Sequence, residues 1–424
     1  MNKEKLMLAD NGTRIYFYKN PSLHSFHIAL FVKSGCMYEA DEECGITHFF
    51  EHISIRNVNR IFDMKLYSIL DKHGLEFNAS TFSEMVQFYV TGASSNFKSG
   101  AKIISEVLSP IKLEKGEIDA ERRRIKAELR ESDDKSSLSS FTSKIVFEGT
   151  PLANSIVGTN RALDRINAKS LEALRKKILT KDNIFFYVTG NFSDSDIEEL
   201  SSAVGKKELY GGVPNTNIAP VPRNFGCRPC KTFVKNSDYT AVRFTFDIDM
   251  DRVSVPESDL IYDMLLSGYN SKLFVEMSEK RGIFYDTNGA TERYLNIGTM
   301  YFSYELKDKD IYDAVAITVD ILNSFKSADT TECECMKAGY VDNAYMLYDD
   351  ARELNFTFAY DNHIMNQGYA DIEERKKAYA SVSAEDIRRA AGEIFKASAL
   401  TLTVKGNKKR IDTQKLEEII RRLG

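Results

Sequence analysis

The segment Gly45–Ile55, which reads GITHFFEHISI, constrains the fold of this chain more than any other part of the sequence. An α-helix with about 3.6 residues per turn gathers its apolar side chains on one face. Those apolar residues are Ile46, Phe49, Phe50 and Ile53. His48, Glu51 and His52 then share the opposite face. The sequence therefore predicts a helix that packs on a hydrophobic core and presents two imidazoles and one carboxylate together.

The polar face of this helix has the composition of a metal site. His48 and His52 lie one helical turn apart, a spacing that lets two ring nitrogens bind one metal ion. Glu51 lies beside them, where a carboxylate can act on a water molecule. The order His-x-x-Glu-His is the inverted zincin signature, the reverse of the commoner His-Glu-x-x-His. The alternative is a solvated surface helix, and the apolar opposite face argues against it.

A third protein ligand has to come from another segment. Residues 114–133 are predicted to form a helix whose inward stripe contains Glu121 and Glu128. The apolar members of that stripe are Ile118, Ile125 and Leu129. Carboxylates that face inward cost free energy unless they are paired or bound to a metal. The same helix carries several other charges, so its periodicity leaves a solvated charged helix equally open.

The length and the charge of the chain limit its organisation and its partners. A chain of 424 residues is too long for one ordinary core, so two or more domains are expected. The net charge of −5 and the lack of a dominant basic block argue against nucleic acid as a partner. No apolar run is long enough to predict a membrane span, and the first residues lack the apolar core of a signal peptide.

Cysteine is sparse, with six in 424 residues, which favours reduced thiols and a cytoplasmic location. The six include two close pairs, Cys227 with Cys230 and Cys333 with Cys335. The two pairs together could hold a structural metal, but nothing in the sequence brings them to one place. Free thiols near the ends of strands and helices are the expected alternative.

The segments around the predicted metal helix have the alternation of β-strands. Residues 13–35 are predicted to form a β-hairpin, in which His24 and His27 are partly exposed strand residues rather than ligands. The segments LEFNASTF and MVQFYVTG follow as a strand pair. Asp41 precedes the metal helix and is expected to cap its N-terminus.

The second half of the chain repeats the first. The helix positions Ile178 and Ile394, and the strand-end positions Gly190 and Gly406, are each 216 residues apart. A constant offset across a helix and a strand indicates two copies of one fold. The second copy has no His-x-x-Glu-His, and its only histidine, His363, is expected at the surface or in packing.

The predicted fold class is α+β. Two homologous α/β lobes are expected to face each other across a cleft, each with a mixed, mostly antiparallel sheet flanked by helices. Residues 209–224 are rich in Gly, Pro and Asn and predict a linker. Residues 1–208 then form the N-terminal lobe that bears the metal motif, and residues 225–424 form a C-terminal, inactive lobe.

With these motifs, the chain resembles the M16 metallopeptidases of the pitrilysin and mitochondrial-processing-peptidase type, and most closely the smaller bacterial two-lobed members. GITHFFEHI resembles the zinc helix of that family, and ERRRIKAELRE resembles its helix with two glutamates seven positions apart. GLEFNAST and MVQFYVTG are similar to its substrate-side strands, and SKLFVEMSEKRGIFY is similar to a segment of its second lobe. The resemblance covers nearly the whole chain.

The resemblance implies one zinc ion per chain, with His48, His52 and Glu128 as ligands. It implies that Glu51 is the general base that activates water, and that Glu121 orients a ligand histidine. The implied function is that of a zinc-dependent endopeptidase subunit. Such a subunit cleaves extended, unfolded peptides, and leader or precursor peptides are candidate substrates.

The same resemblance implies substrate contacts outside the zinc helix. Asn78 would hold the main chain of a substrate that pairs with the strand edge, and Tyr285 would approach it from the second lobe. Many family members have an arginine seven positions before this tyrosine, where this chain has Ser278; Arg281 lies one helical turn further on. The missing arginine favours a heterodimer with a related subunit that supplies an Arg/Tyr pair, over a homodimer. A non-catalytic, two-lobed peptide-binding or scaffold subunit is the alternative function.

Overall fold

The computed structural model describes residues 3–131, 137–229, 231–232, 234–235, 237, 239–267, 270–284 and 287–424. The chain divides into two compact units. Unit 1 comprises Met1–Asp134, Asn154–Asn217 and Tyr345–Ile372, and unit 2 comprises Lys135–Ala153, Ile218–Ala344 and Glu373–Gly424. The units are interleaved along the sequence, which differs from the consecutive lobes at residues 1–208 and 225–424 that the sequence predicts.

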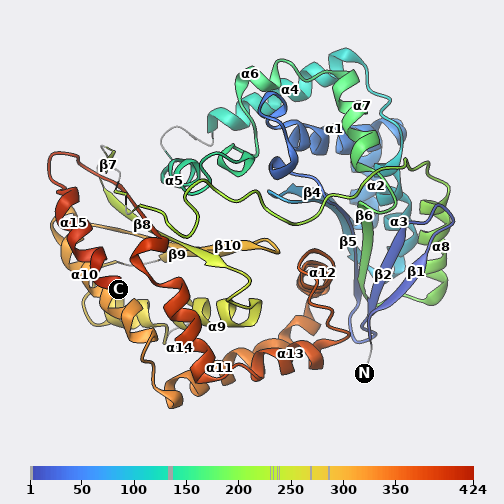
Figure 1. Ribbon diagram of the computed structural model, residues 1–424. Helices are drawn as coiled ribbons and strands as arrows, with labels where there is room; N and C mark the ends of the chain where they lie inside the picture. Colours follow the sequence, from blue (N-terminus) through green and yellow to red (C-terminus); the bar gives the residue numbers. More distant parts are fainter. Residues whose placement is uncertain are drawn as a thin grey trace. The chain divides into compact units, whose positions relative to one another are not determined.

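Unit 1 contains a six-stranded sheet in the order β1-β2-β6-β3-β5-β4 (Figure 1). Its strands are β1 (Lys5–Leu8), β2 (Arg14–Lys19), β3 (Ser25–Val32), β4 (Glu76–Thr81), β5 (Val86–Ala93) and β6 (Ile184–Gly190). Among these strands β2 and β6 pair in parallel, and the other neighbours are antiparallel. The predicted hairpin over residues 13–35 is wrong, because the wholly buried strand β6 lies between β2 and β3.

One face of this sheet packs against helices. The helices of unit 1 are α1 (Ile46–Ile61), α2 (Leu66–His73), α3 (Phe97–Ser105), α4 (Lys115–Glu131), α6 (Asn160–Leu163), α7 (Ala168–Ile178), α8 (Asp194–Gly205) and α12 (Ala351–Ala359). The buried core joins Leu30 of β3, Phe88 of β5 and Phe186 of β6 to Phe49 of α1 and Leu171 of α7. Alternate strand residues point to this face, as the period of two in a strand requires.

Helix α12 covers the opposite face of the same sheet (Figure 1). The Asn355 side chain donates a hydrogen bond of 2.8 Å to the carbonyl of Tyr187, and Thr189 donates one of 2.6 Å to the carbonyl of Ala351. His27 of β3 lies beneath this helix and is fully buried. The prediction that His27 is partly exposed is therefore wrong, because a helix from the far end of the chain covers it.

Unit 2 contains a five-stranded sheet in the order β7-β11-β8-β10-β9. Its strands are β7 (Val234–Lys235), β8 (Thr240–Asp249), β9 (Thr287–Arg293), β10 (Ile297–Leu306) and β11 (Leu400–Lys405). Among them β7 and β11 pair in parallel, and the other neighbours are antiparallel. The helices of this half of the structure are α5 (Leu138–Val146), α9 (Val255–Leu266), α10 (Ile311–Phe325), α11 (Thr330–Asn343), α13 (Ile372–Ala380), α14 (Ala384–Ile394) and α15 (Thr413–Ile420).

The two sheets repeat one topology. Apart from β1, the strand order of unit 1 has the same sequence of parallel and antiparallel neighbours as that of unit 2. Helices α7 and α14 span eleven residues each, start 216 positions apart, and begin with capping boxes at Asn167 and Ser383. The predicted fold class, two homologous α/β units with mixed and mostly antiparallel sheets, is confirmed.

An exchange of helices explains why the units are interleaved. Helix α12 comes from the second half of the chain and packs on β3 and β6 of unit 1. Helix α5 comes from the first half and packs on β8 and β11, the equivalent strands of unit 2, where Thr142 and Thr403 are hydrogen-bonded at 2.6 Å. Each sheet therefore has one face covered by a helix from the other half of the sequence.

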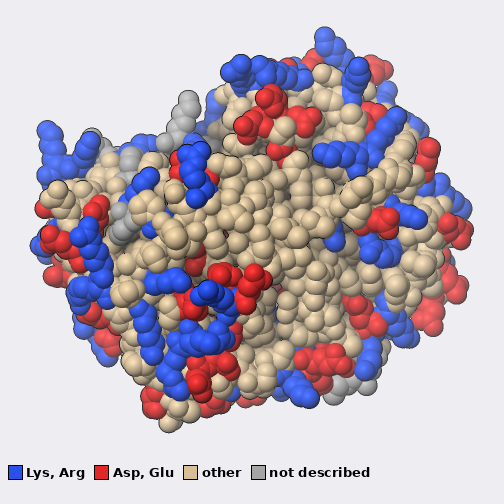
Figure 2. All heavy atoms as spheres, in the orientation of Figure 1, with Lys and Arg blue, Asp and Glu red and all other residues tan. Residues whose placement is uncertain are grey.

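The charged residues are mixed in sign on the face drawn in Figure 2, where Lys and Arg are interspersed with Asp and Glu. Such a surface lacks the continuous basic field that nucleic-acid binding uses. Among the described helices, none combines the length and the apolar character needed to cross a lipid bilayer.

Candidate metal centre

Helix α1 holds the predicted metal residues on a well-anchored segment. Its apolar residues Phe49, Phe50 and Ile53 are buried in the core of unit 1, as the sequence predicts. The helix begins after Gly45, whose φ of 89° lies in the left-handed region that favours glycine. A Cβ at Gly45 would lie 2.6 Å from the Cα of Gly158, so the close approach of two backbones also requires glycine here.

The N-terminus of α1 is capped by a carboxylate that sequence reasoning missed. Glu39 accepts hydrogen bonds of 2.8 Å from the backbone N–H groups of Gly45 and Thr47. Asp41 was the expected cap, but it starts a short 3-10 turn and makes no capping bond to α1. A negative charge at the N-terminus also interacts favourably with the positive end of the helix dipole.

Two imidazoles and a carboxylate converge between α1 and α4. The His48 Nε2 atom lies 3.6 Å from Glu128 Oε1, and the His52 Nε2 atom lies 3.6 Å from Glu128 Oε2. One ligand atom from each residue lies within 4.8 Å of the others. Two ligands of a tetrahedral zinc ion are separated by about 3.4 Å when each metal bond is about 2.1 Å. The described donor set therefore fits a zinc ion after small movements.

A second carboxylate, that of Glu121, orients His52 by contacting the ring nitrogen that does not face Glu128. Its Nδ1 atom lies 3.4 Å from Glu121 Oε2, and Arg56 donates a 2.6 Å hydrogen bond to Glu121 Oε1. Burial raises the pKa of Glu121, but the hydrogen bonds from His52 and Arg56 outweigh it and hold the pKa below its usual value. An ionised Glu121 favours the tautomer of His52 with a lone pair on Nε2, the atom that faces Glu128.

His48 differs from His52 in having no such support. Its Nδ1 atom is buried and has no hydrogen-bond partner among the described residues. Burial, together with the neighbouring His52, lowers the pKa of His48 to about 4. The ring is thus neutral near pH 7 and offers a lone pair, which is the form that binds a metal ion.

Glu51 stays outside the three-residue cluster and is held by a neighbouring strand. Thr81, at the end of β4, donates a 2.6 Å hydrogen bond to Glu51 Oε2. Burial raises the pKa of Glu51, and the hydrogen bond from Thr81 opposes part of that increase. A buried carboxylate with a raised pKa beside a metal cluster has the properties of a proton acceptor. The contact between Thr81 and Glu51 spans thirty residues, so local sequence patterns do not reveal it.

Asn78 lies on the same strand as Thr81. Strand β4 forms one edge of the sheet of unit 1, next to β5. The Asn78 side chain is exposed, and its Oδ1 atom accepts a 2.9 Å hydrogen bond from the backbone N–H of Ala79. Strand β4 therefore contacts Glu51, the carboxylate that neighbours the metal cluster on α1, through Thr81.

The residues expected to act from the second half of the chain lie in unit 2. Ser278 lies in a π-helical turn, Phe274–Glu279, and Tyr285 lies outside the described residues.

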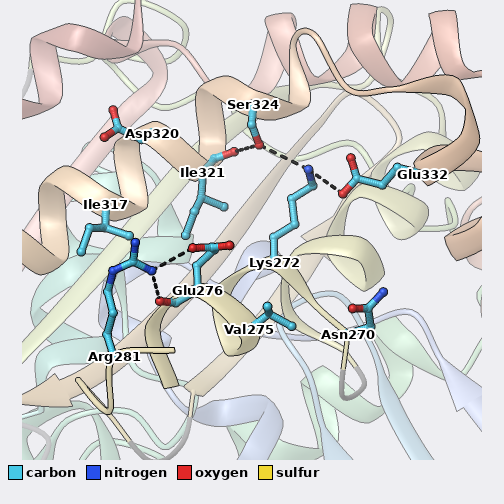
Figure 3. Close-up of a pocket in the computed structure, with 10 residues that line it drawn as sticks. All are labelled: Asn270, Lys272, Val275, Glu276, Arg281, Ile317, Asp320, Ile321, Ser324 and Glu332. Atoms are coloured by element: carbon cyan, nitrogen blue, oxygen red, sulfur yellow. Dashed lines mark hydrogen bonds and ion pairs between the residues drawn. The ribbon is translucent and has the colours of Figure 1, made fainter. Parts of the chain in front are cut away.

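Arg281 is engaged within unit 2. Figure 3 shows it bonded to Glu276, whose carboxylate lies 2.8 Å from its guanidinium and whose carbonyl also accepts a hydrogen bond. On the other side of the same pocket, of about 380 Å³, Lys272 contacts Ser324 and Glu332. Asp320, which also lines the pocket, pairs with Arg422, so the charged side chains around this pocket already have ion-pair partners.

The cysteine pairs contribute no metal cluster in the part of the chain that the structure describes. Cys333 is buried, whereas Cys227 and Cys335 are exposed, and none of them joins a candidate cluster. Cys230 lies outside the described residues. Among the described residues, the candidate metal cluster consists of His48, His52 and Glu128.

Comparison with known proteins identifies the family. Residues 14–160 match the model for insulinase, peptidase family M16, and residues 165–338 match the model for the peptidase M16 inactive domain. An uncharacterized zinc protease of Rickettsia bellii is 24% identical over 410 residues, which cover 94% of this chain and 96% of that protein.

Two solved structures share the fold. A protease from Helicobacter pylori has a TM-score of 0.81 at 16% identity, and the match covers 96% of this chain and 100% of that one. A structure from Pseudomonas fluorescens, described as a peptidase M16 inactive domain, has a TM-score of 0.82 at 14% identity, covering 96% and 98%. The chain belongs to the M16 metallopeptidase family, among its small bacterial members.

Proposed function

We propose that this chain is the zinc-bearing subunit of an endopeptidase. In this proposal His48, His52 and Glu128 bind one zinc ion, and Glu51 is the general base. The observation that carries the proposal is the convergence of His48, His52 and Glu128 from α1 and α4, with the Glu51 carboxylate nearby but outside the cluster. The family match and the zinc-protease name of a relative support it.

The chemistry follows from the positions of the side chains. A bound zinc ion supplies Lewis-acid chemistry, which polarises a peptide carbonyl and lets water lose a proton near neutral pH. Glu51 accepts that proton at Oε1, because Oε2 already accepts the hydrogen bond from Thr81. It then delivers the proton to the leaving amine. Glu121 and Arg56 keep His52 in place during these transfers.

The substrate is an extended, unfolded peptide. The open edge of β4 can add a peptide as a further strand, and Thr81 at the end of β4 contacts Glu51. Asn78, exposed on β4, holds the substrate main chain in this arrangement. Backbone pairing depends little on side chains, so leader and precursor peptides of varied sequence are suitable substrates.

A related partner subunit completes the enzyme in this proposal. Ser278 stands where many family members have an arginine, which the partner would supply. The nearby Arg281 is bound to Glu276. A heterodimer follows if a second chain brings the Arg/Tyr pair, and a homodimer follows if Tyr285 and Arg281 suffice. A cytoplasmic location, favoured by the sparse cysteines, stays a prediction.

A non-catalytic, peptide-binding subunit is the second candidate function. The observation in its favour is the match over 96% of this chain to a structure described as an inactive domain. The complete His-x-x-Glu-His motif and the converging Glu128 favour catalysis instead.

Peptide hydrolysis by matched variants separates the two functions. The chain is purified from its native host at low salt, so that any related partner is retained, and zinc is measured by elemental analysis. Glu51→Gln should keep its zinc and lose activity on a quenched peptide library by about a hundredfold or more. Glu131→Gln, an exposed position at the end of α4, is the control and should keep full activity. Wild-type activity in Glu51→Gln, or zinc-loaded wild type without activity, would reject the peptidase proposal.

A further inference from the structure

One side chain, that of Thr81, holds the Glu51 carboxylate. The Thr81 Oγ1 atom donates a 2.6 Å hydrogen bond to Glu51 Oε2. Among the residues that the structure describes, no second hydrogen bond to this carboxylate is found. A glutamate side chain has three torsions, and the last of them, which turns the carboxylate, is only weakly restricted. The donor on Oε2 therefore decides the direction in which the other oxygen, Oε1, points.

Thr81 is a rigid donor. It is the last residue of β4, and its backbone is in register with Val86 of β5. Threonine is branched at Cβ, which restricts its first side-chain torsion. Thr81 and Asn78 are three positions apart, so their side chains point to opposite faces of the sheet. Thr81 therefore faces α1, while Asn78 faces away from it.

Unit 2 has a threonine at the equivalent place on its own edge strand. In unit 1, cross-strand pairing joins Thr81, Val86, Val32 and Ile184. In unit 2, the corresponding pairing joins Thr291, Met300, Phe246 and Leu400. Ile184 and Leu400 are 216 positions apart, which is the offset of the repeat. Thr81 of β4 and Thr291 of β9 are therefore equivalent.

The two threonines differ in what the neighbouring helix offers them. The Thr291 Oγ1 atom is buried and has no hydrogen-bond partner in the described part of the chain. Helix α9 contacts β9 through Tyr262, whose hydroxyl donates a 2.7 Å hydrogen bond to the carbonyl of Gly289. The edge strand thus tolerates a threonine hydroxyl without a partner. In the unit that bears the metal motif, the same hydroxyl is bonded to a carboxylate.

We propose that Thr81 is a positioning residue for the general base. By holding Oε2 it directs Oε1 of Glu51 toward the reacting water. This inference rests on the proposed peptidase function and deepens it. A general base has to lie within hydrogen-bond reach of the proton that it accepts, and a misplacement of about 1 Å can lower a rate by about a hundredfold. Loss of the Thr81 hydroxyl should therefore slow turnover without weakening the binding of zinc or peptide.

The place of Thr81 also ties the base to the proposed substrate strand. Asn78 and Thr81 belong to one strand, and both are in register with β5. A peptide that adds to the open edge of β4 takes its register from the same backbone. The position of Glu51 relative to the peptide is then set within a single strand.

Kinetics of matched variants test the inference. The chain is purified as above, with any related partner retained, and kcat and KM are measured on one quenched peptide. Thr81→Val keeps the branched shape without the hydroxyl, and should lower kcat by about tenfold to a hundredfold while KM stays within about twofold. Thr81→Ser keeps the hydroxyl and should bring kcat to within about threefold of the wild type. Thr291→Val, the same change in unit 2, is the control and should keep full activity.

A double-mutant cycle in the metal-free protein tests the contact without any activity. Zinc is removed with a chelator, and the midpoints of urea unfolding are measured for Thr81→Val, Glu51→Leu and the double variant. The double variant should shift the midpoint by clearly less than the sum of the two single shifts, because both changes remove the same hydrogen bond. Thr291→Val and Glu51→Leu should add, because the two residues lie in different units.

An unchanged kcat in Thr81→Val would overturn the inference and leave the proposed function standing. An equal loss in Thr81→Val and Thr81→Ser, a loss of zinc from Thr81→Val, or additive shifts in the cycle with Thr81 would overturn it as well. If Thr81→Val fails to fold by circular dichroism, Thr81→Ala takes its place beside Thr81→Ser under the same criteria. A zinc-loaded wild type without activity would instead reject the proposed function, and this inference with it.

Discussion

Units 1 and 2 share a strand order but differ in the helix that follows the shared central strand. In unit 1 the helix after β3 is α1, which presents His48, Glu51 and His52. In unit 2 the helix after β8 is α9, whose sequence VPESDLIYDMLL contains no histidine. The repeat therefore preserves the core positions, and a few polar positions on the helix after the shared strand decide what each unit can bind.

The largest expected difference between the units is in metal binding. Replacing a unit 1 ligand by His48→Ala should lower zinc from one equivalent to less than about a tenth of one, because two ligands hold the ion poorly. His363→Ala removes the only histidine of the second half of the chain and should keep full zinc content. Elemental analysis of both purified proteins gives the answer. Stoichiometric zinc in His48→Ala would show that the metal is bound elsewhere.

The cores of the two units should respond alike to the same substitution. Ile178 of α7 and Ile394 of α14 occupy repeated positions and are 1% and 0% exposed. Ile178→Ala and Ile394→Ala should each lower the free energy of unfolding by about 2 to 5 kcal/mol, from lost burial and a new cavity. Urea unfolding followed by circular dichroism measures both. Costs that differ by more than about 2 kcal/mol would show that equal topology hides unequal packing.

Removal of the Glu121 carboxylate, which contacts His52 in unit 1, should have a smaller effect. Glu121→Gln weakens the hydrogen bond that orients His52 and leaves Arg56 with only the more distant carboxylate of Glu117, 3.9 Å away. Zinc affinity should fall by about tenfold to a hundredfold. Competition with a chelator of known affinity measures this, with Glu131→Gln as the control on the same helix. An unchanged affinity would assign Glu121 to packing with Arg56 alone.

The sequence predicts the parts of this protein that depend on local periodicity. The apolar stripe of α1 and the constant offset between Ile178 and Ile394 are local or repeated patterns, and both the helix and the repeat are present. The convergence of Glu128 with His48 needs a second helix, and only the family resemblance supplied it. Periodicity alone leaves Glu128 ambiguous, because a solvated charged helix has the same pattern.

The remaining features depend on contacts between distant segments. The predicted hairpin failed because β6, far along the chain, pairs with both of its strands. Glu39 caps α1 in place of Asp41, and Thr81 holds Glu51, through contacts set by the tertiary fold. The burial of His27 depends on α12, which arrives from the other half of the sequence. Apart from the Glu39 cap, whose partners are six and eight residues away, no short sequence window contains both partners of these contacts.

The smallest predicted effect concerns a buried histidine on the face of the unit 1 sheet that α12 covers. His27 is fully buried, with Nδ1 hydrogen-bonded at 2.7 Å to Thr91, whereas its equivalent in unit 2 is Ala241. Burial, and then the charge of Arg352, lower the pKa of His27 from 6.5 to about 3. Below pH 6.5 His27 is protonated in the unfolded chain, whereas in the folded chain it is protonated only near pH 3. Stability should therefore fall with decreasing pH in this window, by about 1.4 kcal/mol per pH unit.

His27→Gln should remove this contribution, so its free energy of unfolding should fall less steeply between pH 6.5 and pH 4.5 than that of the wild type. Urea titrations at several pH values measure both slopes, and His24→Gln, at an exposed position just before β3, is the control. Other titrating groups are common to the proteins, so the difference in slope isolates one proton. Equal slopes would mean that the folded chain protonates His27 readily, and α12 would then not seal this face as Arg352 and Asn355 indicate.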